Sequence, residues 1–214
     1  MSLSGWIEHN WIEIFGAVTG IIYVFLEIRQ NLWLWPIGII TSAVYIWVFF
    51  HGKLYADMSM QGYYLAISII GWYWWRRKER VSGGAGEQVI EELKVTRMSL
   101  RLALILAGVF VVLYTSMFFI LREFTDSPVP GFDAFLTSLS IVATWMLARK
   151  IFEHWYLWII VNSAACGLFI YRGLYPTVIL YAVYCLMSFA GLKEWRKSFT
   201  RDQQQVHTTG SEIS

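Results

Sequence analysis

Residues 102–121 read LALILAGVFVVLYTSMFFIL, a run of twenty residues without a charged side chain. About 20 apolar residues are enough for a helix to cross the hydrocarbon core of a bilayer. Six further apolar runs, two of them short enough to need extension by neighbouring turns, occupy residues 14–26, 32–50, 58–75, 134–148, 155–171 and 174–192. The sequence therefore predicts an all-α integral membrane protein with seven transmembrane helices.

The composition agrees with a membrane protein and excludes several other classes. Of the 214 residues, 57% are hydrophobic and 15% are charged, whereas about a quarter of the residues in soluble domains are charged. A small soluble domain has too much surface to bury so many apolar side chains. With a net charge of +2 and 2 cysteines, the chain resembles neither a nucleic-acid-binding module nor a disulfide scaffold. The expected environment is the lipid bilayer, and no nucleic-acid partner is expected.

The distribution of lysine and arginine predicts the orientation. With seven spans, the connections on one side carry 14 of these residues, and the other side carries only Lys53, Arg122 and Arg172. Because basic residues gather in cytoplasmic connections, we expect the N-terminus outside and the C-terminus in the cytoplasm. The long connection 76–101 is then a cytoplasmic tether, with a short surface helix over 87–95. The polar tail after Phe199 is expected to be disordered.

An internal repeat organises the chain. Residues 12–77 align without a gap on 132–197 at an offset of 120 residues. The identical pairs are Phe15/Phe135, Ile21/Ile141, Arg29/Arg149, Trp35/Trp155, Ile39/Ile159, Ile40/Ile160, Phe49/Phe169, Leu54/Leu174, Tyr55/Tyr175, Tyr64/Tyr184, Ser68/Ser188, Gly71/Gly191, Trp75/Trp195 and Arg76/Arg196. We expect a three-helix bundle at 12–77, a connection at 78–131 that contains a linker helix at 102–121, a second three-helix bundle at 132–197, and a cytoplasmic tail at 198–214.

A single linker helix returns the second bundle to the orientation of the first, so the repeat is parallel in a 3+1+3 order. The SWEET transporters have parallel repeats of this kind, and transporters built from repeats bind substrate at the repeat interface near the membrane midplane. The repeat therefore favours a transport path, with a purely structural scaffold as the alternative.

Polar and aromatic side chains recur at helical spacing on three of the expected spans. Because polar groups are costly in hydrocarbon, they are expected to face the interior of a bundle or a water-filled cavity. The stripes are Gln61, Tyr64, Ser68 and Trp72 on the third span, Trp155, Trp158 and Asn162 on the sixth, and Thr177, Tyr181, Tyr184 and Ser188 on the seventh. Hydrogen bonds between helices are the alternative explanation for each of them.

This lining suits a flat, polar, heteroaromatic solute. Tryptophan and tyrosine rings stack on such a ring and attract it more strongly if it is cationic. Amide side chains pair with hydroxyl or carboxamide groups. No lysine or arginine lies in the middle of a span, where it could hold a phosphate. A solute without a phosphate group is therefore favoured. No carboxylate lies there either, which favours facilitated diffusion over a proton-coupled mechanism.

Motifs for enzyme chemistry are lacking in the sequence. It has no P-loop, no Gly-x-Ser-x-Gly and no His-Glu-x-x-His motif, and Cys166 and Cys185 lie on different spans. We therefore expect no catalytic residues, no metal site and no cofactor, and a membrane-embedded enzyme is the disfavoured alternative.

The sequence resembles the PnuC family of vitamin transporters over residues 12–196. In the first half the resemblance lies in Trp35-Pro36-Ile37-Gly38, Leu54-Tyr55-Ala56-Asp57, Gln61, Tyr64 and Gly71-Trp72. In the second half it lies in Trp155-Tyr156-Leu157-Trp158, Asn162, Gly173-Leu174-Tyr175-Pro176-Thr177 and Leu180-Tyr181-Ala182-Val183-Tyr184.

The resemblance implies uptake of nicotinamide riboside by facilitated diffusion across the bacterial inner membrane, trapping by a cytoplasmic kinase, and assembly as a homotrimer. It also implies a substrate-binding site made of Gln61, Tyr64, Trp72, Trp155, Trp158, Asn162, Tyr181 and Tyr184. Relatives in this family carry thiamine or riboflavin. Thiamine remains an alternative substrate, because Cys166 and Gly167 stand where many members of the family have bulkier residues. Asn162 favours the riboside.

Overall fold

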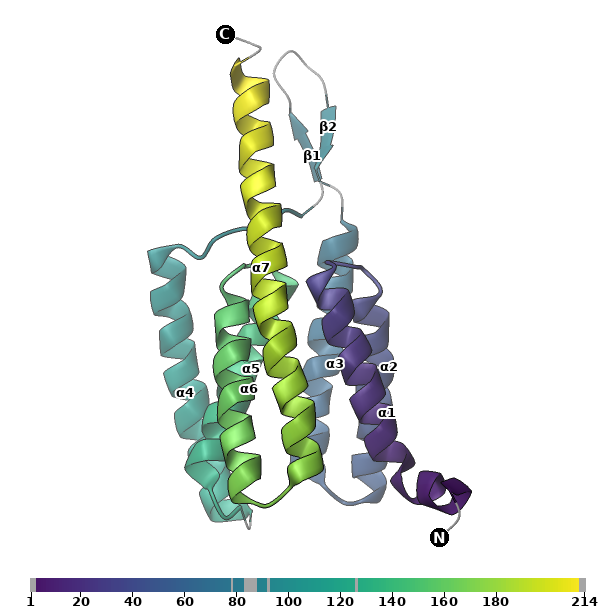
Figure 1. The fold of residues 1–214 in the computed structure, drawn as a ribbon. Helices are drawn as coiled ribbons and strands as arrows, with labels where there is room; N and C mark the ends of the chain where they lie inside the picture. Colours follow the sequence, from purple (N-terminus) through teal and green to yellow (C-terminus); the bar gives the residue numbers. More distant parts are fainter. Residues whose placement is uncertain (1–2, 78, 83–87, 92, 126, 212–214) are drawn as a thin grey trace. The chain divides into compact units, whose positions relative to one another are not determined.

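The computed structural model describes residues 3–77, 79–82, 88–91, 93–125 and 127–211. Within these ranges the chain forms seven helices and one two-stranded ribbon (Figure 1). The helices are α1 (Leu3–Ile28), α2 (Leu34–His51), α3 (Tyr55–Arg76), α4 (Leu100–Phe124), α5 (Pro130–Ala148), α6 (His154–Tyr171) and α7 (Tyr175–Ser211). The chain divides into two compact units, Met1–Arg76 and Arg77–Ser214.

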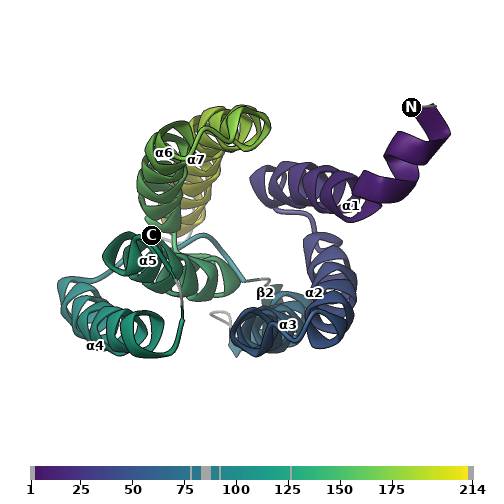
Figure 2. The ribbon, with the colours of Figure 1, turned by 90° about the horizontal axis from the view of Figure 1, so that it is seen from below.

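The first unit is a series in which α1 packs on α2 and α2 packs on α3 (Figure 2). Glycines allow the close contacts. The hydroxyl end of Tyr45 on α2 occupies the space where a side chain at Gly16 of α1 would stand, and the Tyr45 hydroxyl donates to the Ile12 carbonyl at 3.4 Å. The indole of Trp35 likewise lies directly over Gly71 of α3 and meets the Trp75 ring edge-on, with 5.4 Å between centroids.

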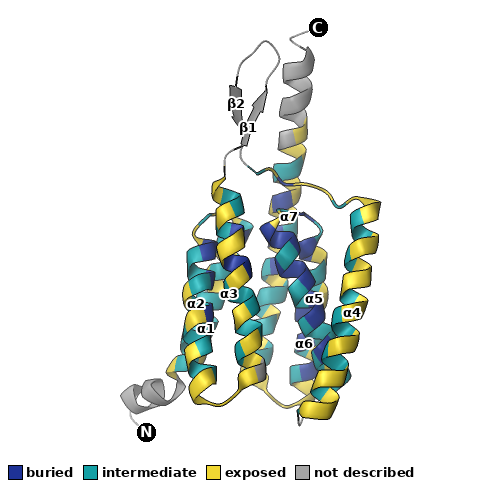
Figure 3. Cartoon of the chain, turned by 180° about the vertical axis from the view of Figure 1, so that it is seen from behind, coloured by how far each residue is buried: buried dark blue, intermediate teal, exposed yellow. Residues whose placement is uncertain are grey.

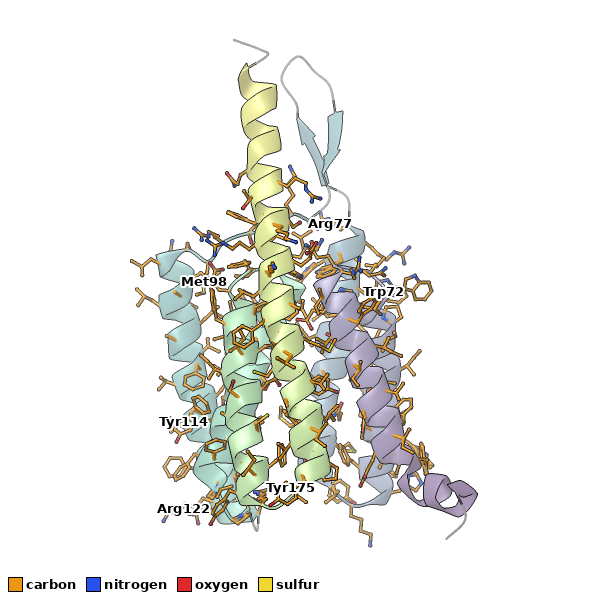
Figure 4. All side chains as sticks on the ribbon, in the orientation of Figure 1. Trp72, Arg77, Met98, Tyr114, Arg122 and Tyr175 are labelled. Atoms are coloured by element: carbon orange, nitrogen blue, oxygen red, sulfur yellow. The ribbon has the colours of Figure 1, made fainter. Side chains whose placement is uncertain are left out.

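In the second unit α4 packs on α5, α5 on α6, and α6 on α7. Val142, Met146 and Ile151 form a buried cluster at one end of α5, and apolar residues of α4 cover it. The segment that leads into α4 is fastened to the α5–α6 connection, because the Met98 amide donates to Glu153 Oε2 at 2.9 Å. Figure 4 shows Met98 at this end of α4 and Arg122 at the other.

The internal packing of the second unit repeats that of the first. Trp155 lies directly over Gly191 and meets Trp195 edge-on at 5.9 Å, as Trp35 does with Gly71 and Trp75. The two pairs of corresponding turns also carry residues with positive φ, at Gln30 and Lys150 and at Lys53 and Gly173. Residues 120 positions apart in the sequence therefore make the same packing contacts in the two units. The predicted boundaries of the two bundles, 12–77 and 132–197, stay a prediction.

Exposure of apolar side chains fits a protein surrounded by lipid. Six of the helices are long and apolar enough to cross a membrane; α3, which contains Asp57 and Gln61, is outside this set. Helix α4 buries none of its residues, whereas half of α5 is buried (Figure 3). Leu104 of α4, for example, is 67% exposed. The predicted all-α membrane fold with seven helices is confirmed.

Two local predictions are wrong. In place of a surface helix over 87–95, the connection forms an antiparallel ribbon in which β1 (Glu79–Ser82) pairs with β2 (Gln88–Glu91). The tail after Phe199 is also not irregular, because α7 continues to Ser211. Arginine and glutamine are good helix formers, and no proline interrupts this segment, so the helix continues beyond its apolar part.

Candidate functional site

The centre of the candidate site is Asn162, which α6 and α7 hold in place. Its side chain is 5% exposed, and its Nδ2 donates to Ser188 Oγ on α7 at 3.1 Å. The Ser188 hydroxyl in turn donates to the Tyr184 carbonyl one turn back, at 2.8 Å. This chain fixes the orientation of the amide. The bond uses one N–H of a group that has two donors and a carbonyl acceptor, so Asn162 retains capacity for a ligand.

Trp158 lies one turn before Asn162 on α6 and is partly exposed. Its indole Nε1 is buried and has no hydrogen-bond partner within the described part of the chain. An unpaired buried donor costs free energy, so a ligand that supplies an acceptor would relieve that cost. Trp158 and Asn162 therefore offer a ring face, a donor and an amide on adjacent turns.

Trp155, the third residue of this stripe, lies in a packing position. It is 1% exposed, covers Gly191, and contacts the rings of His154 and Trp195. Its counterpart Trp35 is equally buried in the first unit. The structure thus places Trp155 in the core of the α6–α7 pair, and its contact with a substrate stays a prediction.

Two tyrosines of α7 continue the aromatic surface of the second unit. The rings of Tyr181 and Tyr184 meet edge-on with centroids 5.8 Å apart, and Phe169 of α6 lies 5.1 Å from Tyr181. Both tyrosines are partly exposed. Together with Trp158 and Asn162 they form what we call the α6–α7 face.

The first unit carries a second polar face on α3. Gln61 and Tyr64 are partly exposed, and Ser68, one turn beyond Tyr64, is buried. Gly38 of α2 permits the approach of this face, because a Cβ there would lie 2.8 Å from Ser68 Oγ. Trp72 lies at the end of α3, where the Arg76 guanidinium covers its ring at 5.5 Å. We call Gln61, Tyr64 and Ser68 the α3 face.

Sequence reasoning missed several buried polar residues, among them Glu27 and Ser138. Glu27 of α1 is 2% exposed, although it directly follows the predicted apolar run 14–26. Ser138 of α5 is fully buried, and its hydroxyl has no partner within the described residues. The internal alignment contains the signal for both, because the corresponding positions hold Leu147 and Val18, so a polar group is not part of the shared packing.

No group of three or more potential metal ligands gathers among the residues that the structure describes. Cys166 and Cys185 are free thiols on the facing sides of α6 and α7. The Cys185 sulfur lies 3.3 Å from Ser163 Oγ, and the Cys166 thiol points to the Val178 carbonyl at 3.8 Å. Both cysteines therefore have local partners in the helix pair.

The sequence is similar to one known protein family and to individual transporters. The model of the nicotinamide mononucleotide transporter family matches residues 10–197. The "Nicotinamide riboside transporter PnuC" of Escherichia coli (strain K12) is 25% identical over 91% of this chain and 89% of its own length. The "Riboflavin/roseoflavin transporter RibM" of Streptomyces davaonensis is 26% identical over 92% and 89%, respectively.

A solved structure also resembles the chain. It is described as the "Crystal structure of the Vitamin B3 transporter PnuC", and it aligns with a TM-score of 0.68 and 26% identity over 90% of this chain and 83% of that one. The sequence comparison and the fold comparison therefore identify the same group of transporters.

Proposed function

Because the chain belongs to the nicotinamide mononucleotide transporter family, we propose that this membrane vitamin transporter carries nicotinamide riboside. The family consists of transporters, not enzymes. The proposal rests above all on the α6–α7 face, where Trp158 offers an unpaired N–H one turn from the oriented amide of Asn162. A carboxamide and ribose hydroxyls are acceptors and donors that match these two groups.

The charge of the two faces favours the riboside over the mononucleotide in the family's name. A bound phosphate is normally held by arginine, lysine or a row of backbone N–H groups. Neither the α6–α7 face nor the α3 face contains a lysine or arginine. Burial of an uncompensated dianion there would be costly, so the phosphorylated compound is expected to bind more weakly.

We propose facilitated diffusion as the mechanism, with the riboside trapped by a cytoplasmic kinase. Phosphorylation turns the product into a poor ligand for the same faces and keeps the gradient directed inward. The connections on one side carry 14 basic residues and those on the other side carry 3. This difference supports an N-terminus outside and a C-terminus in the cytoplasm. Assembly as a homotrimer is proposed from the family resemblance alone.

A second candidate substrate is riboflavin, favoured by the 26% identity to the riboflavin/roseoflavin transporter of Streptomyces davaonensis. Thiamine is a third, since its flat cationic rings also suit tyrosine and tryptophan faces. The riboside ranks ahead of both, because the similar solved structure is that of a vitamin B3 transporter.

Titration calorimetry on the purified protein tests the choice among these solutes. We expect nicotinamide riboside to bind, and nicotinamide mononucleotide, thiamine and riboflavin each to bind at least tenfold more weakly. Tighter binding of riboflavin or thiamine would replace the proposed substrate. Equal binding of the mononucleotide would contradict the argument from charge.

A further inference from the structure

The turn between α1 and α2 has the same backbone geometry as the turn between α5 and α6. Gln30 and the corresponding Lys150 have φ angles of 51° and 52°. The amides of Gln30 and Asn31 donate to carbonyls of α1 at 3.0 and 2.9 Å, and the amides of Lys150 and Ile151 donate to carbonyls of α5 at 2.9 Å each. The two turns are therefore structural copies of each other, one in each unit.

In the second unit an extended segment covers this turn. The Thr96 amide donates to the Lys150 carbonyl at 3.0 Å, and the Phe152 amide donates to the Thr96 carbonyl at 2.9 Å. Val95, the residue before Thr96, is buried. We call residues 94–98 the strap. It pairs with the turn through its main chain, as a strand pairs with the edge of a sheet.

The corresponding turn of the first unit has no such cover among the residues that the structure describes. The Gln30 carbonyl and the Leu32 amide occupy the positions of the Lys150 carbonyl and the Phe152 amide. Neither is hydrogen-bonded to another described residue. Trp33, which follows Leu32, is 68% exposed. The first unit thus presents one main-chain acceptor and one main-chain donor in the arrangement that binds the strap.

The side chains of the first turn indicate what kind of segment it accepts. In the second unit Glu153 accepts from the Met98 amide at 2.9 Å, and the corresponding residue of the first unit is Trp33. Arg29, at the start of the first turn, is exposed. An exposed cation and an exposed indole therefore flank the open main-chain groups. A segment with acidic side chains complements that charge.

We propose that the α1–α2 turn binds an extended, acidic segment of a cytoplasmic protein, which pairs with Gln30 and Leu32 in the way that the strap pairs with its own turn. Addition of an extended segment through main-chain hydrogen bonds is a recurring mode of peptide recognition. The proposed orientation places this turn in the cytoplasm, because Arg29 belongs to the side of the chain that is rich in basic residues. The inference does not depend on which vitamin the protein carries.

Hydrogen exchange on the purified protein in detergent tests whether the first turn is open. The Leu32 amide should exchange about tenfold faster than the Phe152 amide or more, because only the Phe152 amide is paired with the strap. Equal protection of the two amides would mean that another part of the chain or a second copy already covers the first turn. That result would overturn the inference.

A labelled peptide then tests the pairing by fluorescence polarisation. It has the sequence of residues 93–99 with glutamate in place of Lys94 and Arg97, and it should bind the full-length protein and slow exchange at Leu32. Methylation of its Thr96 amide removes the donor to the Gln30 carbonyl and should weaken binding about fivefold. Methylation of the amide at position 97, which is unpaired among the described residues of the strap, should change the affinity less than about twofold.

Two variants of the protein test the charge argument. Arg29→Gln should weaken binding of the acidic peptide about threefold, as expected for an exposed ion pair. The matched control is Arg149→Gln at the turn that the strap already covers, and it should bind the peptide as the unsubstituted protein does. Equal loss in both variants would contradict the role of Arg29.

The location of the peptide decides the remaining outcomes. Binding that leaves exchange at Leu32 unchanged would place the peptide elsewhere and overturn the inference. No binding of the acidic peptide, or equal effects of the two methylations, would overturn it as well.

Discussion

The indole N–H of Trp158 differs from two other unpaired indoles among the residues that the structure describes. Trp35 and Trp155 also bury an Nε1 without a partner in the described residues, but they occupy corresponding positions of the repeat. Their orphan donors therefore belong to the scaffold that both units share. Trp158 corresponds to Gly38, so its donor has no counterpart in the first unit. A group that one unit adds to a common framework is a good candidate for function.

Trp158→Phe tests this donor without removal of the aromatic surface. A hydrogen bond to a ligand is worth about 1 kcal/mol, so we expect the affinity for nicotinamide riboside to fall by roughly fivefold. Trp33→Phe, at a position that is 68% exposed, is the matched control and should bind as the unsubstituted protein does. Calorimetry measures the affinity of both variants. Unchanged affinity in Trp158→Phe would show that the indole N–H does not bind the ligand.

At this scale the sequence predicts which residues are polar or aromatic on a helix face, but not how deeply each is buried. The spacing of Trp158 and Asn162, four residues apart, predicts that they share one side of α6. It could not distinguish Trp155, which covers Gly191, from Trp158, because burial depends on the neighbouring helix. For the same reason the apolar run 14–26 does not indicate that Glu27, the residue after it, is buried.

At the scale of elements, the apolar runs predict the helices because backbone groups in lipid must be paired within the segment. This constraint ends at the membrane surface. The ribbon of β1 and β2 and the continuation of α7 to Ser211 lie outside the apolar runs, where local propensity and pairing decide the structure. Both were mispredicted for that reason, whereas α3 was predicted from the charge-free run 58–75 despite its polar residues.

Close packing of α6 on α7 depends on the absence of a side chain at Gly191. A Cβ there would overlap the fully buried Trp155 ring, so Gly191→Ala should destabilise the protein by about 1–3 kcal/mol and lower its melting temperature. The matched control is Gly167→Ala on α6, where a Cβ meets nothing within 4 Å. Since alanine favours a helix over glycine, this variant should be as stable or more stable. A thermal unfolding curve in detergent distinguishes them; equal melting temperatures would contradict the packing argument.

At the scale of the whole molecule, the proposed function is that of a passive carrier. The family match spans residues 10–197, which includes both units, so the function belongs to the chain as a whole and not to one half. The α6–α7 face contains no carboxylate, as expected for the facilitated diffusion proposed above.

Uptake into proteoliposomes tests the central claim most directly. Purified protein in vesicles that contain no kinase should admit labelled nicotinamide riboside until the inner and outer concentrations are equal. The final level should be the same with and without an imposed proton gradient. Accumulation above the outer concentration when the gradient is applied, or no uptake beyond that of empty vesicles, would contradict the account.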